Sequence, residues 1–288
     1  MKVQSLSIVV PNKKCVNNCK FCVANMLEED YKNQLENPAF YDLYEIDYKK
    51  RLEFARDNGC NVVMLTGNSE PQQNRGFLKM FGTMNKSLNN PFKCIEMQTT
   101  GVMLNEEYLR FLRNHVGVTT ISVSLSSFDD DVNAEYEQAN PKLYVPLVEL
   151  CDMIKKYDFN LRLSINLTDS FNNFNVQNIF DRAKKFGADQ VTFRVLYESN
   201  LETDQNKWMQ IHRADYTLVD TINKYILKHG RPLERLEFGA MKYSVDEMST
   251  VLDNDCMSIK EQETLKYLIL RENCKLYTKW DDKGSLLF

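Results

Sequence analysis

Short apolar segments alternate with amphipathic segments over the first 200 residues of the chain. Residues 3–10 alternate and then become continuously apolar, as a strand does when it enters a buried sheet. Five later segments share this apolar character, and helically spaced segments separate them. The predicted later strands are 61–66, 93–99, 119–125, 160–167 and 190–196, and the predicted helices are 45–58, 74–88, 105–115, 143–157 and 175–187. This alternation predicts an α/β protein with a parallel sheet, either an open (β/α)6 partial barrel or a doubly wound sheet.

The rhythm changes after residue 200. A long helix is predicted over 204–228, closed by Gly230 and Pro232, with inward positions at Trp208, Ile211, Leu218, Ile222 and Ile226. The remaining segments resemble short strands at 236–245, 249–252, 265–270, 274–280 and 285–288, with a hairpin turn at 281–284. We therefore expect a core of residues 1–200 and a small α+β extension of residues 201–288.

Composition narrows the function classes only slightly. Hydrophobic residues make up 43% and charged residues 26% of the 288 residues, which is ordinary for a globule with a sizeable core. A net charge of -4 gives no electrostatic case for wholesale binding to a nucleic-acid backbone. Eight cysteines, with neither a signal-peptide core nor a membrane-spanning run, lead us to expect a cytoplasmic protein whose thiols are free to bind metal.

Three of those cysteines fall within eight residues, directly after the first predicted strand. Cys15, Cys19 and Cys22 have the spacing C-x3-C-x2-C, and no fourth Cys or His lies within twenty residues. Structural zinc takes four protein ligands, and a fully ligated four-iron cluster takes four cysteines. Three thiolates on one loop fit a [4Fe–4S] cluster whose remaining iron takes a non-protein ligand. Incidental or zinc-binding thiols in a non-enzymatic protein are the alternative.

This motif, with the aromatic Phe21 before the third cysteine, resembles that of the radical S-adenosylmethionine (radical SAM) superfamily. The resemblance implies a partial (β/α)6 barrel whose C-terminal extension closes the barrel. It also implies a cluster bound by the three cysteines and chelated by SAM. An external electron donor such as flavodoxin or ferredoxin would drive cleavage of SAM to a 5′-deoxyadenosyl radical, which abstracts hydrogen from a substrate. Phe21 would shelter the cluster and border the adenine.

Ligands of parallel α/β proteins gather at the carboxyl ends of the strands, so those ends test the resemblance independently. The segment Gly67-Asn68-Ser69-Glu70 is similar to the family's Gly-Gly-Glu-Pro segment, although Asn68 and Ser69 replace a simple Gly-Glu step. Glu70 offers an acceptor for the SAM ammonium group. Thr99 and Thr100, before Gly101, are similar to the family's Thr-Asn-Gly turn.

The next strands carry polar residues on one face. Ser122 and Ser124 share a face, and Ser126 stands where the family has an aspartate, so Ser124 is the safer SAM contact. Asn166 resembles the family's ribose contact, and Arg194 is placed to pair with a carboxylate or phosphate. A satisfied internal ion pair is the alternative for Arg162 and for Arg194.

The remaining cysteines are scattered. Cys60, Cys94 and Cys151 are expected to be buried structural thiols, while Cys256 and Cys274 are too few for a second cluster. We expect a small-molecule substrate, with nucleotides and nucleosides among the candidates, because no peptide-recognition domain is evident. A peptide or protein along a sheet edge is the alternative. Candidate substrate contacts, against the alternative of an ordinary solvated hairpin, are Tyr243, Arg271, Tyr277, Lys279, Trp280, Asp281 and Asp282.

Overall fold

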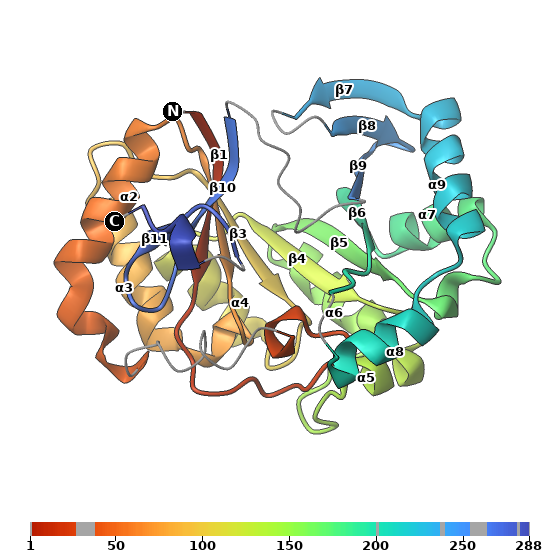
Figure 1. The fold of residues 1–288 in the computed structure, drawn as a ribbon, viewed down its shortest axis with the longest axis horizontal. Coiled ribbons are helices and arrows are strands. Elements are labelled where there is room, and N and C mark those ends of the chain that lie inside the picture. Colours follow the sequence, from red (N-terminus) through yellow and green to blue (C-terminus); the bar gives the residue numbers. More distant parts are fainter. Residues whose placement is uncertain are drawn as a thin grey trace.

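One curved sheet, open at both ends, organises the protein in a computed structural model (Figure 1). The structure describes residues 2–26, 38–199, 202–236, 240–253, 264–280 and 283–287. Among these residues the strand order is β11-β10-β1-β2-β3-β4-β5-β6-β9-β8-β7. The strands are β1 (Lys2–Val9), β2 (Val62–Thr66), β3 (Cys94–Thr99), β4 (Thr120–Leu125), β5 (Asn160–Leu167), β6 (Gln190–Val195), β7 (Arg231–Arg235), β8 (Met241–Val245), β9 (Met248–Asp253), β10 (Thr264–Leu270) and β11 (Leu276–Tyr277).

The helices follow the strands as the alternation predicts. The α-helices are α2 (Glu45–Asp57), α3 (Arg75–Lys86), α4 (Glu106–Phe111), α5 (Asp130–Glu137), α6 (Leu147–Lys156), α7 (Val176–Lys185), α8 (Asp204–His212) and α9 (Tyr216–His229). The 3₁₀-helices are η1 (Val23–Asn25), η2 (Pro38–Tyr44), η3 (Pro71–Gln73), η5 (Asp169–Phe171) and η6 (Lys283–Ser285), and η4 (Leu112–Val116) is a π-helix. No helix of the described residues has the length and apolar character needed to cross a membrane.

Strands β1 to β6 are parallel neighbours in chain order. A doubly wound sheet would reverse its strand order at a switch point, and this sheet does not. The prediction of a partial parallel barrel is therefore confirmed. Its hydrophobic core lies between the strands and the outer helices, and Leu6, Leu65, Phe77, Leu163 and Ile179 are among its fully or almost fully buried members.

The C-terminal strands extend both edges of the six-stranded core. β10 pairs in parallel with β1, and β9 pairs in parallel with β6. β8 and β7 continue antiparallel from β9, while β11 pairs antiparallel with β10. Residues from beyond position 200 therefore form walls at both sides of the open barrel (Figure 1).

The predicted helix over 204–228 is wrong as a single helix. It breaks into α8 and α9 because the intervening backbone bonds to the end of β5: Arg213 bridges Thr168, and the Ala214 N–H donates to Leu167 O at 3.0 Å. Ile211, predicted to face inward, is 74% exposed. Trp208 is partly buried, and Leu218, Ile222 and Ile226 are buried as predicted.

Other boundaries near the C-terminus also differ from prediction. Leu236 does not begin a strand; its N–H donates to Ala240 O at 2.8 Å, and β8 begins at Met241. Strand 274–280 shrinks to β11, and in place of strand 285–288 there is a single bridge from Tyr277 to Leu286. The predicted hairpin turn, with Asp281 and Asp282, lies outside the described residues except for its last two positions. The predictions of β9 and β10 are confirmed.

Candidate functional site

The cysteine loop (residues 15–22) lies beyond the carboxyl end of β1, and its backbone is tied to the next turn along the sheet. The Val16 N–H donates to Gln73 Oε1 at 3.0 Å, and Gln73 Nε2 donates to Lys14 O at 2.8 Å. Asn17 Nδ2 donates to Thr100 Oγ1 at 3.1 Å, after β3. The loop that carries the three thiols is therefore anchored on the same strand ends that the sequence marks for ligand binding.

The end of helix α5 holds the other side of the cysteine loop. The Lys20 N–H donates to Tyr136 O at 2.9 Å, and the Lys20 ammonium pairs with Glu135 at 2.7 Å. Asn18 Nδ2 donates to Gln138 Oε1 at 2.8 Å. Asn17 and Asn18 therefore anchor the loop in two directions, one on the turn after β3 and the other on the end of α5.

The three thiols of the cysteine loop form no disulfide within the described residues and are only partly exposed. Burial raises the pKa of Cys15, and it raises the pKa of Cys19 well above the ordinary value. The nearby carboxylates of Glu70 and Glu137 raise the pKa of Cys19 further. Thiols in such surroundings become thiolates when a cation compensates their charge, so metal binding here releases protons.

The donor set fits a multi-iron cluster. Three soft thiol ligands from one loop, with no fourth protein ligand in it, suit iron and sulfide better than a closed zinc site. Within the described ranges, no three His, Cys, Asp or Glu side chains converge closely enough to hold one metal ion. A four-iron cluster separates its thiolates across several iron atoms, so it does not require that convergence.

A small cavity of about 190 Å³ opens beside the loop at the ends of β2, β3 and β4. It brings together most of the residues predicted to bind SAM: Gly67, Ser69, Glu70, Thr99, Thr100, Ser122, Ser124 and Arg194. Asn68 lines a second cavity instead, and Phe21 packs on the cysteine loop against Trp208, with ring centroids 6.0 Å apart. Asn166 lies just behind the small cavity, where its Nδ2 donates to Ser124 Oγ and Ser126 Oγ at 3.2 Å each.

Glu70 joins the ends of β2 and β3. Its Oε1 accepts hydrogen bonds from the Thr100 N–H at 2.9 Å and the Thr100 hydroxyl at 2.7 Å, and its Oε2 accepts from the Thr99 hydroxyl at 2.7 Å. Burial raises the pKa of the carboxyl, while the hydrogen bonds from Thr100 and Thr99 oppose that shift. Oε2 keeps acceptor capacity for a further donor in the small cavity.

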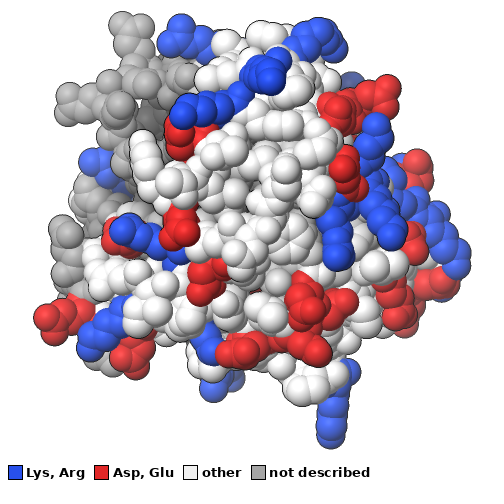
Figure 2. Space-filling view, turned by 90° about the vertical axis from the view of Figure 1, so that its right-hand side faces the viewer, with Lys and Arg blue, Asp and Glu red and all other residues white. Residues whose placement is uncertain are grey.

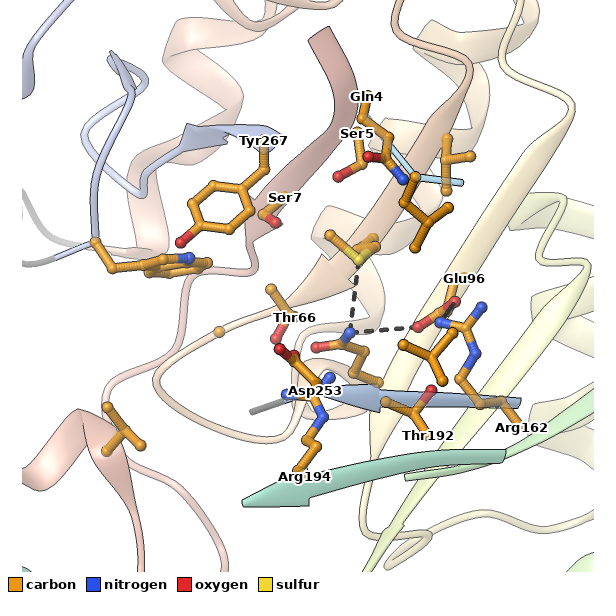
Figure 3. A pocket seen from close by; sticks show the side chains of 18 of the residues that line it. Gln4, Ser5, Ser7, Thr66, Glu96, Arg162, Thr192, Arg194, Asp253 and Tyr267 are labelled. Carbon is orange, nitrogen blue, oxygen red and sulfur yellow. Dashed lines mark hydrogen bonds and ion pairs between the residues drawn. The ribbon is translucent and has the colours of Figure 1, made fainter. Parts of the chain in front are cut away.

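A large cavity of about 450 Å³ occupies the barrel interior between both edges of the sheet (Figure 3). Its lining shares Thr66, Gly67, Gln98 and Arg194 with the small cavity, so the two meet at these residues. Tyr267 and Trp280 line it from the β10 side, and Asp253 and Lys242 from the β8–β9 side.

The two arginines of the barrel interior differ. Arg162 forms an ion pair with Glu96 at 2.5 Å and donates to Gln190 at 2.9 Å, so the internal ion-pair alternative is confirmed for this residue. Arg194 makes no hydrogen bond or ion pair within the part of the chain that the structure describes, and its Nε is buried without a partner. It is therefore a cation available to a ligand at the junction of the two cavities.

Comparison with known proteins places this site in a family. The model of the radical SAM superfamily matches residues 9–160, more than half of the chain. The protein belongs to the radical SAM superfamily. Membership implies an enzyme that uses a [4Fe–4S] cluster and SAM. No curated protein sequence matches the chain.

Two solved structures of radical SAM proteins share the fold. Native anSMEcpe with bound AdoMet is similar with a TM-score of 0.60 and 10% identity, covering 99% of this chain and 77% of that chain. Coproporphyrinogen III oxidase (HemN) from Escherichia coli is similar with a TM-score of 0.53 and 12% identity, covering 80% of this chain and 54% of HemN. The chain thus spans about half the length of HemN, and at these identities the likeness shows the fold alone.

Two groups beside the radical SAM motif are not among the site residues that the sequence predicts. Trp208 of α8 packs on Phe21 and stacks on His212, whose Nδ1 lies 2.9 Å from Asp169 Oδ2. Glu137 ends α5 with 0% exposure, and neither carboxylate oxygen has a hydrogen-bond partner in the described structure. Helical spacing marked Trp208 as inward, but nothing in the charged sequence around Glu137 signals its burial.

The cysteines outside the radical SAM motif agree only in part with prediction. Cys60 and Cys151 are buried as expected, and Cys274 is buried too. Cys94 is exposed, which contradicts the expectation, because it begins β3 at the outer end of the strand. Cys256 lies outside the described residues.

Substituting glutamine for Glu137 is expected to stabilise the apoprotein at high pH. Burial raises the pKa of this carboxyl well above its ordinary value. The unfolded chain therefore loses the proton at lower pH than the folded chain, and stability falls as pH rises above the ordinary carboxyl pKa. Urea unfolding of Glu137→Gln at pH 8 should show a gain on the order of 1–3 kcal/mol, and little gain near pH 4. An equal effect at both pH values would contradict this prediction.

Proposed function

We propose that this protein cleaves SAM reductively at a [4Fe–4S] cluster and uses the 5′-deoxyadenosyl radical to abstract hydrogen from a small-molecule substrate. The observation that carries the proposal is the junction of the two cavities. The small cavity adjoins the cysteine loop and is lined by residues of the segments that resemble the family's SAM-binding motifs. It meets the large cavity at Arg194 and Gln98, which line both.

The residues of the chain have distinct roles in this proposal. Cys15, Cys19 and Cys22 hold the cluster, and Phe21 with Trp208 covers it from one side. Together the cluster and SAM supply an electron and a radical precursor. Glu70 fixes the turns after β2 and β3, and it accepts a hydrogen bond from the SAM amino group.

The other SAM contacts in the proposal are polar side chains of the small cavity and its rim. Ser122 and Ser124 on β4 offer hydroxyls to the cofactor, and Asn166, which already donates to Ser124, orients one of them. Enclosure by the sheet keeps water away from the reacting atoms.

The shape of the large cavity supports a small molecule over a peptide. Its volume of about 450 Å³ falls within the range typical of small-ligand sites. A peptide added along a sheet edge needs an open strand, and β7 is the outer strand on one side. The exposed β7 carries Arg231, Pro232, Glu234 and Arg235, residues that blunt an edge against strand addition.

An external electron donor such as flavodoxin or ferredoxin completes the proposed reaction. Charged side chains of both signs surround a central area without them on the side of the molecule that carries α8 and α9 (Figure 2). Trp208 lies on α8, between that side and Phe21 of the cysteine loop. A donor that binds near α8 would therefore approach the cluster through aromatic side chains.

The decisive experiment is anaerobic. The protein is reconstituted with iron and sulfide, reduced with dithionite and given SAM, and 5′-deoxyadenosine is measured by chromatography. Its formation would support the radical reaction. A protein that binds no cluster, or that binds a cluster without binding SAM, would overturn the proposal in favour of a non-enzymatic metal-binding protein.

A further inference from the structure

Among the charged side chains that line the large cavity in the described structure, one cation has no ion-pair partner and is available to a ligand. Among the described residues, three cations (Arg162, Arg194 and Lys242) and two carboxylates (Glu96 and Asp253) line it. Arg162 and Glu96 neutralise each other, and Lys242 pairs at 3.1 Å with Glu234. Asp253 stands opposite Arg194 in the β6–β9 register without forming an ion pair with it. Arg194 therefore remains, with five N–H donors suited to an oxyanion.

The opposite wall is aromatic. Tyr267 on β10 lies on the side of the cavity away from Arg194 (Figure 3), and Trp280 also lines the cavity, with the two ring centroids 6.3 Å apart. Arg271 fixes Trp280 by donating to its backbone carbonyl oxygen. Immobilised aromatic rings at a cavity wall suit a flat ring of a ligand, because stacking needs no further ordering of the protein.

Polar groups on the neighbouring strands complete the lining. Ser5 and Ser7 present hydroxyls from β1, and Thr192 presents one from β6. The Oε1 atom of Gln4 is buried without a hydrogen-bond partner, so it can accept a hydrogen bond from a ligand. The cavity thus combines one oxyanion site, one flat-ring site and several groups that hydrogen-bond hydroxyls and ring nitrogens.

We propose that the substrate is a nucleoside monophosphate, with its phosphate on Arg194 and its base against Tyr267 and Trp280. This inference rests on the proposed function and specifies its substrate class. A single phosphate fits better than a triphosphate, because only one cation lacks a partner and the Asp253 carboxylate stands beside it. Ribose hydroxyls and base edges match the polar groups of β1 and β6.

Equilibrium binding tests the inference without requiring turnover. The four ribonucleoside 5′-monophosphates, the matching nucleosides and triphosphates, and ribose 5-phosphate are titrated anaerobically into the reconstituted protein with SAM present. At least one monophosphate should bind about tenfold more tightly than its nucleoside and its triphosphate. Arg194→Gln should abolish the preference for the monophosphate over the nucleoside. Trp280→Leu should weaken monophosphate and nucleoside alike by about tenfold, since stacking contributes to both, and should leave ribose 5-phosphate unchanged.

The control variant is Arg231→Gln, which removes an exposed cation on β7 and should change none of these affinities. Failure to bind any monophosphate more tightly than its nucleoside would overturn the inference, and so would equal losses for monophosphate and nucleoside in Arg194→Gln. The proposed function is judged separately by 5′-deoxyadenosine formation. A protein that forms 5′-deoxyadenosine but ignores nucleotides retains the function and loses this inference.

Discussion

Replacing Cys19 with alanine should abolish the iron–sulfur cluster and, with it, all formation of 5′-deoxyadenosine. The loop offers three thiols and no fourth cysteine or histidine within twenty residues, so no spare ligand takes over. The same loss is expected for Cys15→Ala and Cys22→Ala. The measurement is iron and sulfide content per chain after anaerobic reconstitution, together with the visible absorbance of the cluster and the yield of 5′-deoxyadenosine.

The matched control is Cys94→Ala. Cys94 is also a free, solvent-accessible thiol, but it starts β3 at the end of the sheet opposite the cysteine loop. This variant should keep the full iron and sulfide content. A normal cluster in any of the three loop variants would show that the ligand set is wrong. Loss of the cluster in Cys94→Ala would show that reconstitution does not report on the loop alone.

The six strands of the core and the helices α2, α3, α4, α6 and α7 could be predicted because each strand is buried on its outer face and each helix packs one apolar stripe, whereas α5 is not among the predicted helices. The break between α8 and α9 could not be predicted. It depends on the bridge between Arg213 and Thr168 and on the hydrogen bond from the Ala214 N–H to Leu167 O at the end of β5, more than forty positions away in the chain. The spacing of the apolar residues on both sides of that break resembles one continuous helical face and conceals the break; these residues are Trp208, Ile211, Leu218, Ile222 and Ile226.

The site residues could also be predicted only in part from the sequence. Strand ends are visible in a sequence, so the residues of the small cavity could be named in advance from their positions. Pairings across the cavity are not visible. Arg162 pairs in register with Gln190, and Arg194 pairs with Asn166 on the same two strands, yet of the two arginines only Arg162 forms an ion pair with a carboxylate among the described residues. Glu137 lies in an acidic helix that resembles a solvated surface, yet it is fully buried and lies near Cys19 of the cysteine loop.

The Glu70 contacts link the sheet to the cysteine loop. Thr100 donates to Glu70 and accepts from Asn17 of the loop, so one hydroxyl connects the carboxylate to the cluster-binding segment. Gln72, two residues after Glu70, donates to the Thr99 hydroxyl and to Val102 O. A change at Glu70 therefore acts on the turn after β3 as well as on any ligand in the small cavity.

Replacing Glu70 with alanine should weaken SAM binding by roughly 10- to 100-fold, the loss of a buried charge-assisted hydrogen bond of about 1.5–3 kcal/mol. The cluster should remain, because the three thiols and their anchors at Gln73 and Tyr136 are untouched. The measurement is anaerobic equilibrium binding of SAM, with iron content determined on the same sample. The free energy of unfolding should also fall, since the Thr99 hydroxyl and the Thr100 N–H lose their acceptor.

The variant Thr100→Val separates the two roles of Glu70. It removes one hydroxyl contact to the carboxylate and the acceptor of Asn17 Nδ2, but it leaves the Thr100 N–H bond and the carboxylate itself. If Glu70 binds SAM directly, Thr100→Val should cost much less SAM affinity than Glu70→Ala at a comparable loss of stability. Equal losses in both variants would assign Glu70 a purely structural role. Unchanged SAM affinity in Glu70→Ala would show that the turn after β2 is not the cofactor site.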